Sequence, residues 1–256
     1  MKEIKTIPIY NRKSQKLTSI TESEFKAIKD DVDERFFIVE GEFVMVKSRF
    51  FRTEHLVTHQ KLYIKDKKIT FQKQKGIDYK KVLFILESPH RHEYDYEKNF
   101  SPRMPLYGNL NTFQSHFESL MFELTEEENY AYEVVLYNPV PYQTSLHYLL
   151  KRNVKEQTRF KFWLYGWLEL KYHREFDRYL NQYKFDYYLN ASTRMYKSII
   201  SYKLSTLVNT EYQVYHPSSG FWNRKEAKFG IKKIIHLDDS HFLFHLPKEE
   251  ERNSIS

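Results

Sequence analysis

Residues 82–86, VLFIL, decide the fold that this sequence predicts. Five consecutive apolar residues are typical of a strand that is covered on both faces of a sheet. Three later runs have a similar character, namely YEVVLY at residues 132–137, KFDYYL at 184–189 and EYQVY at 211–215. Segments with helical spacing accompany them at residues 109–124, 157–183, 194–208 and 224–231. The alternation predicts an α/β fold, a three-layer α/β/α domain with a mostly parallel four-stranded central sheet.

The segment before these strands has a different pattern. RFFIVE and EFVMVK meet at Glu40-Gly41, and KLYIK and KITFQ meet at Asp66-Lys67, as short strands joined by turns would. A chain of 256 residues is long enough to bury a sizeable core and to carry an appended subdomain. We therefore expect a β-rich N-terminal extension or subdomain at residues 1–78 and an α/β domain at residues 79–256.

The composition of the chain favours some classes of function and excludes others. The 41 Lys and Arg against 34 Asp and Glu give a net charge of +7, which favours a polyanionic partner but is shared by many surfaces that bind nothing acidic. The absence of cysteine excludes disulfides, thiolate-held zinc, iron–sulfur clusters and cysteine nucleophiles. No glycine-rich phosphate-binding motif is present, so a nucleotide cofactor has no support. No apolar run approaches the roughly 20 residues of a membrane span, and we expect a cytoplasmic protein.

Polar residues follow each predicted strand of the α/β domain. They are Glu87, Ser88 and His90 after the first strand, Asn138 after the second, Asn190 after the third, and His216 and Ser218 after the fourth. Any one of them also fits a simple role in capping its own loop. Because the carboxyl ends of parallel strands meet at one edge, we expect the set to converge there. A carboxylate, a neutral histidine and an amide together can orient water, stabilise developing charge and read a heterocycle.

A metal site is a separate possibility. His90, His92, Glu93 and His216 are all possible ligands. Two histidines at i and i+2 on a loop are far less specific than an HExxH pattern, and exposed loop histidines are the simpler interpretation. We expect no metal and no cofactor, while a metal-dependent nuclease stays open as an alternative.

Four segments in order resemble the motifs of the uracil-DNA glycosylase superfamily. VLFILESPHRHEYDY with PLYGNL resembles the first motif and the loop after it, VVLYNPVPYQTSL resembles the strand that ends in the base-reading asparagine, YLNASTR resembles the third strand and its exit, and VYHPSSGFWNR resembles the final HPS motif. The resemblance covers roughly residues 80–235. Its style is that of the Glu-containing, family 4-like branch, whose four cysteines this chain lacks. Antiviral glycosylases of the superfamily offer a precedent for modified bases as substrates.

The resemblance implies a monofunctional, metal-independent DNA glycosylase that flips a uracil or, in preference, a modified base and leaves an abasic site. Glu87 would orient the attacking water, and His216 would stabilise charge on the departing base. The base-binding residues would be Ser88, His90, Asn138 and either Leu106 or Tyr107. The DNA-binding residues would be Ser218, Ser219, Phe221, Trp222 and Arg224.

Other functions stay open beside this one. For Phe221 and Trp222, packing of the last helix on the sheet is as good an interpretation as a wedge inserted into DNA. The same fold could recognise a base or DNA without cleaving it. A nuclease, or a hydrolase of a free nucleoside or nucleotide, are the remaining alternatives.

Overall fold

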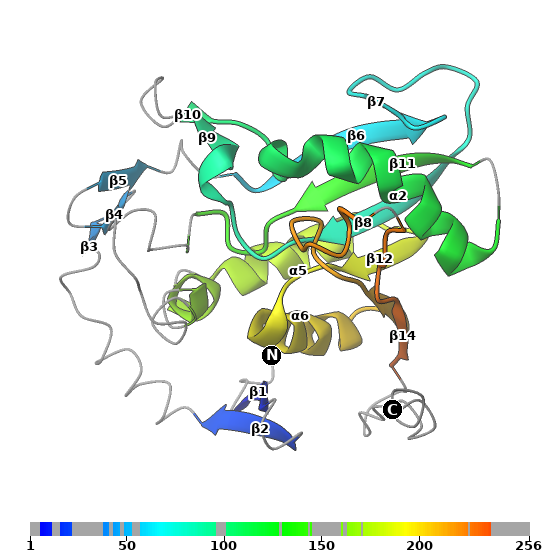
Figure 1. The fold of residues 1–256 in the computed structure, drawn as a ribbon. Helices are drawn as coiled ribbons and strands as arrows, with labels where there is room; N and C mark the ends of the chain where they lie inside the picture. The colour runs from blue at the N-terminus through cyan, green and yellow to red at the C-terminus, as the bar shows by residue number, and fades with distance from the viewer. Residues whose placement is uncertain are drawn as a thin grey trace, which may run out of the picture.

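The computed structural model describes residues 6–11, 16–21, 38–40, 43–46, 49–52, 57–95, 101–127, 130–142, 144, 160, 163–169, 171–224 and 226–236. Its main element is a sheet of seven strands in the order β14-β13-β12-β8-β11-β6-β7 (Figure 1). These strands are β6 (His59–Lys65), β7 (Lys68–Thr70), β8 (Tyr79–Ile85), β11 (Ala131–Tyr137), β12 (Tyr187–Asn190), β13 (Thr210–Gln213) and β14 (Lys232–Ile235).

The α/β class predicted from the sequence is confirmed, but a mostly parallel four-stranded sheet is wrong. The four predicted strands are adjacent and parallel in the order β11-β8-β12-β13. Three further strands extend this block, and each of them pairs antiparallel: β6 with β11, β7 with β6, and β14 with β13. The sheet is therefore mixed. Of these three antiparallel pairings, only that of β7 with β6 is made by a short hairpin.

The β6–β7 hairpin is the part of residues 1–78 that joins this sheet. Asp66 and Lys67 connect its strands with φ of 51° and 55°, which are the positive values that two-residue hairpin turns require. Leu62 and Ile64 on β6 are fully buried. The span predicted as an N-terminal subdomain thus contains two strands of the central sheet.

Three α-helices match three of the predicted helical segments. They are α2 (Leu110–Thr125), α5 (Tyr172–Gln182) and α6 (Arg194–Ser205), and a π-helical turn, η4 (Tyr165–Glu169), precedes α5. Short 3-10 turns are η2 (Arg91–Glu93) and η3 (Tyr107–Asn109). The helix predicted over residues 224–231 is wrong, because the described residues of that segment are not helical. Phe229 instead accepts a long-range backbone hydrogen bond from Tyr215 at 2.7 Å, and Gly230 has φ of 60°.

The helices cover both faces of the sheet, as Figure 1 shows with α2 on one side and α5 and α6 on the other. Alternation along β8 explains this: Val82 and Phe84 point to the side of α2, whereas Leu83 and Ile85 point to the side of α5 and α6. All four side chains have no exposed surface. A strand that is apolar on both faces fits only the middle of a three-layer domain.

Three smaller sheets complete the described elements. β1 (Thr6–Asn11) pairs with β2 (Lys16–Thr21), β3 (Ile38–Glu40) and β5 (Arg49–Arg52) flank β4 (Phe43–Val46), and β9 (Tyr94–Asp95) pairs with β10 (Ser101–Pro102). The strands predicted to meet at Glu40-Gly41 are the antiparallel pair β3 and β4. Within the described part of the chain, no helix combines the length and the apolar character needed to cross a membrane.

Candidate active site

The four parallel strands end level with one another. Ile85 of β8 pairs with Tyr137 of β11 and with Asn190 of β12, and Asn190 pairs in turn with Gln213 of β13. The polar residues that follow these strands therefore begin at one edge of the sheet. This is the convergence that the sequence predicts.

Glu87 is fixed in place at the centre of this edge. One oxygen of its carboxylate, Oε2, accepts hydrogen bonds from the backbone N–H of Thr193, at 3.1 Å, and from the Thr193 hydroxyl. Its backbone carbonyl accepts the indole N–H of Trp163 at 2.8 Å and the N–H of Val140 at 3.3 Å. The backbone of Glu87 is thus tied to the exit of β11, and its carboxylate is tied to the exit of β12. The sequence analysis did not identify Thr193, which stands at the N-cap of α6 and whose side chain bonds to Glu87 rather than to its own helix.

His216 is held in one tautomer. Its Nδ1 accepts the backbone N–H of Ser218 at 3.1 Å and lies 2.7 Å from the Ser218 hydroxyl. A backbone N–H can only donate, so Nδ1 carries no proton and the neutral ring has its proton on Nε2. Burial, with added repulsion from Lys197 and His90, lowers the pKa of His216 to about 4. At neutral pH the residue is consequently an uncharged hydrogen-bond donor.

A half-buried lysine acts on these two residues and was missed by the sequence analysis. The ammonium of Lys197, on α6, donates to the carbonyl of Val214 at 2.5 Å, two residues before His216. Burial lowers the pKa of Lys197 to about 8, while Glu211 and Glu87 act in the opposite direction. Its charge therefore acts on both candidate catalytic residues. A lysine on an otherwise amphipathic helix gives no sequence signal that separates this position from the solvent face.

Asn138 is buried and its amide is firmly oriented. The residue has no exposed surface, and its Nδ2 donates to the carbonyl of Val57 and to Oε2 of Glu93, each at 3.1 Å. Its backbone N–H donates to Thr58 at 2.7 Å. Glu93 is itself buried, and this burial raises its pKa to about 8 against the effect of three N–H donors, from Asn138 and from the backbones of His90 and Leu106.

The other predicted base-binding residues surround this group. The Ser88 hydroxyl hydrogen-bonds the Thr144 hydroxyl at 2.7 Å. His90 is half-buried, its ring centroid lies 5.1 Å from that of His92, and its charge helps to lower the pKa of His216. Both residues follow β8 at the edge where Glu87 lies.

Leu106 and Tyr107 differ in their surroundings. Leu106 has φ of 64° and its side chain is buried in the core on the α2 side. Tyr107 is 47% exposed, and the Arg103 guanidinium lies 4.6 Å from its ring centroid. Tyr107 therefore presents its ring at the surface, whereas Leu106 is buried and donates its backbone N–H to the Glu93 carboxyl.

The predicted DNA-binding loop after β13 separates into exposed and buried residues. Phe221 is at the surface, stacked on Tyr215 at 4.7 Å, with Arg224 at 4.5 Å from its ring centroid. Trp222 is fully buried and donates its indole N–H to Tyr215 at 3.0 Å. A wedge role for Trp222 does not fit this burial. Trp222 packs in the core on the α2 side, although the helix whose packing was the alternative explanation is not formed at the described residues of 224–231. The hydroxyl of Ser219 is buried without a described partner.

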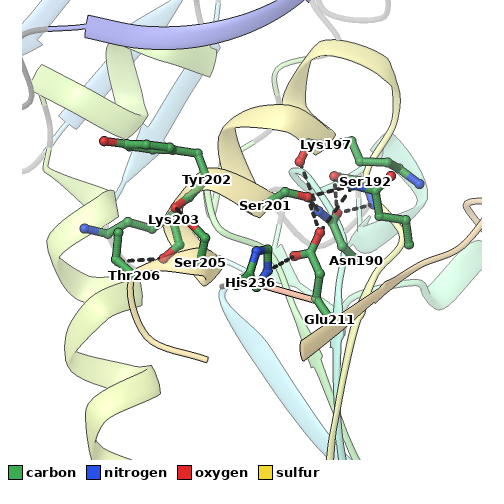
Figure 2. Close-up of polar contacts among 11 residues, drawn as sticks. Asn190, Ser192, Lys197, Ser201, Tyr202, Lys203, Ser205, Thr206, Glu211 and His236 are labelled. Atoms are coloured by element: carbon green, nitrogen blue, oxygen red, sulfur yellow. Dashed lines mark hydrogen bonds and ion pairs between the residues drawn. The ribbon is translucent and has the colours of Figure 1, made fainter. Parts of the chain in front are cut away.

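A buried polar network supports β12, β13 and α6 below the edge (Figure 2). The Ser201 hydroxyl donates to Glu211, and Asn190 Nδ2 donates to Ser201 at 3.1 Å and to the Lys197 carbonyl at 3.0 Å. Nε2 of His236 lies 3.9 Å from the second Glu211 oxygen. Burial raises the pKa of Glu211 to about 7. Because it bonds the Lys197 carbonyl and the end of β12, the network helps to position α6 under the candidate site.

The alternative metal site has no support in the geometry. Over the described residues, no three His, Asp or Glu side chains gather in a way that could hold a metal ion. Of the four candidate ligands, Glu93 instead bonds Asn138, and His216 bonds Ser218 through Nδ1.

Comparisons with protein-family models, with curated proteins and with solved structures found no significant match for this chain.

Proposed function

We propose that this protein is a metal-independent DNA glycosylase that hydrolyses the N-glycosidic bond of a flipped uracil or modified base. One observation carries the proposal: a histidine held as a neutral donor follows the same sheet edge as an anchored carboxylate and a buried amide. These are the residue types that glycosidic cleavage of a nucleotide needs, and each comes from a different strand end. The ordered sequence motifs and the net charge of +7 add support.

The chemistry follows from these groups. The C1′–N bond breaks and its electron pair leaves with the base, so the base becomes negative and the sugar positive. The Nε2–H of His216 would hydrogen-bond the base anion, and Asn138 would hold the base edge. The Glu87 carboxylate would stabilise the sugar cation and take the proton of the water that adds to C1′. The products are a free base and an abasic site.

Lys197 supports the same reaction without touching the base. A cation close to His216 disfavours the protonated ring and favours negative charge that develops nearby. It also favours the ionised form of Glu87 that the reaction requires. A half-buried lysine held by the Val214 carbonyl thus suits a site in which an anion leaves.

The test is release of bases from DNA. Purified protein is incubated in chelator with oligonucleotides that carry normal bases, uracil or hypermodified bases, and the products are analysed by mass and by alkaline cleavage. We expect one class of base to be freed, with alkali-labile sites in equal amount. Glu87→Gln should slow this release by about 10²–10⁴-fold and His216→Ala by about 10²–10³-fold.

Matched controls come from α2, where Glu118 accepts a backbone N–H from Lys67, in the β6–β7 turn, at 2.8 Å. Glu118→Gln and His116→Ala should release the base at the wild-type rate. Binding of DNA without release of any base would reject the glycosylase in favour of a recognition module. Strand breaks that appear only after divalent metal is added would instead favour a nuclease.

A further inference from the structure

The Asn138 amide has both of its N–H groups engaged and its oxygen unpaired. The N–H groups face the carbonyl of Val57 and the carboxyl of Glu93, each at 3.1 Å. Its Oδ1 is buried and has no hydrogen-bond partner among the described residues. Native proteins rarely leave a buried acceptor in this condition, because the lost hydration is costly. A ligand that donates an N–H would satisfy it.

This orientation of the amide is determined by its neighbours. If the amide turned over, Oδ1 would face the carbonyl oxygen of Val57, which can only accept, and that hydrogen bond would become a repulsive contact. Oε2 of Glu93 would repel Oδ1 in the same way whenever that oxygen carries no proton. Glu93 cannot easily turn away, since the backbone N–H groups of His90 and Leu106 also donate to its carboxyl. Glu93 therefore links the loop after β8, the loop before α2 and the end of β11.

We propose that Glu93 is a positioning residue that fixes the orientation of the Asn138 amide, so that the site accepts a base that presents an N–H donor to the Asn138 oxygen. Asn138 then offers the base an acceptor and no donor. A base that presents only a carbonyl or a ring nitrogen acceptor to Asn138 finds no hydrogen-bond donor on that side chain. This inference rests on the proposed function for the identity of the ligand, but the hydrogen bond by which Glu93 orients Asn138 is a property of the protein alone.

The chemical class that follows is a base with a ring N–H, as in uracil-type rings, or an exocyclic amino group, as in cytosine-type rings. Modification at other ring atoms is compatible with this requirement. Methylation of the donor nitrogen is not. Release of 3-methyluracil or N4,N4-dimethylcytosine should therefore be at least about tenfold slower than release of the parent base that is the substrate, the cost of one lost hydrogen bond in a buried site.

A double-mutant cycle tests whether Glu93 acts through Asn138. Glu93→Gln preserves the side-chain size and an acceptor for the backbone N–H groups, but it directs an amide NH2 at the Asn138 NH2. We expect Glu93→Gln to slow base release about tenfold or more, and to have less than about a twofold effect when Asn138→Ala is already present. Glu118→Gln is the control in both backgrounds. Equal slowing in both backgrounds would overturn the proposal, because a purely structural role would give that result.

A second measurement needs no substrate. In ¹⁵N-labelled protein, hydrogen exchange at the Asn138 side-chain amide should be slow compared with that of exposed Asn111. Glu93→Gln should accelerate this exchange about tenfold or more, and Glu118→Gln should leave it unchanged. If wild-type protein releases no base, the glycosylase proposal fails while this measurement still tests the hold on Asn138. Unchanged exchange in Glu93→Gln would overturn the inference, whatever the activity.

Discussion

Glu211 offers a direct quantitative test of the buried network below the site. Its side chain has no exposed surface, and its Oε1 accepts hydrogen bonds from Ser201 and from Gln213 at 3.2 Å. Glu211→Gln preserves the shape and the accepting oxygen. The new NH2 group takes the place of Oε2, which lies 3.9 Å from Nε2 of His236. From that position the NH2 group can act as a hydrogen-bond donor towards this nitrogen. The substitution thus removes the charge and little else.

The sign and size of the effect follow from the pKa. Burial raises the pKa of Glu211 from 4.5 to about 7, so folding disfavours the ionised form. Stability that is present below pH 4.5 is therefore lost as the pH rises towards 7, by about 3 kcal/mol in the free energy of unfolding. A glutamine does not ionise and avoids this loss. Glu211→Gln should equal the wild type near pH 4.5 and exceed its stability by up to about 3 kcal/mol at pH 8.

The assay is urea unfolding followed by circular dichroism at several pH values between 4.5 and 8. Exposed Glu226→Gln is the control, and it should show no pH-dependent difference from the wild type. A Glu211→Gln protein that is less stable than the wild type at pH 8 would refute the reasoning. Glu211 would then be held as an anion, with Lys197 as its nearby cation.

Four further predictions concern the residues around the edge. Trp222→Ala should cost about 3–5 kcal/mol of unfolding free energy, because it empties a buried site, whereas exposed Phe221→Ala should change stability by less than about 1 kcal/mol. Phe221→Ala should also weaken binding of duplex DNA in a fluorescence anisotropy titration, and unchanged binding would reject its wedge role. Thr193→Val should slow base release about tenfold through Glu87 with little change in melting temperature, and an unchanged rate would contradict that contact's importance. An NMR titration of His216 should give a midpoint near pH 4, and a midpoint near its ordinary value would contradict the effect of burial.

The sequence predicted the central parallel strands and three helices because their signals are local. The run VLFIL is apolar on both faces, and the apolar residues of α2 recur at helical spacing, so neither needs knowledge of a distant partner. The edges of the sheet could not be predicted in this way. Which strand pairs with β11 or β13 depends on contacts between distant segments, and the chain signals only that a hairpin exists.

The candidate site shows the same division. The positions of Glu87, Asn138 and His216 follow from the ends of parallel strands, and that part of the prediction needed only the strand order. The residues that hold them were missed or misread. Thr193 reaches Glu87 across 106 positions of sequence, and Glu93 was considered only as a metal ligand because nothing in a loop sequence indicates that a carboxylate is buried. Hydrogen-bond partners of this kind depend on packing rather than on pattern.

The hydrogen bonds that orient Asn138 also determine where this protein could be divided into fragments. Its side chain and backbone donate to Val57 and Thr58, which directly precede β6, the strand that pairs with β11 from Tyr132 to Tyr137. A fragment that begins at residue 79 would leave β11 as an open edge and remove the carbonyl groups that orient the amide. The smallest portable unit, for a chimera or for transfer of the site to another scaffold, therefore begins before residue 57. A boundary drawn where the sequence pattern changes would separate the proposed base-reading residue from the segment that holds it in position.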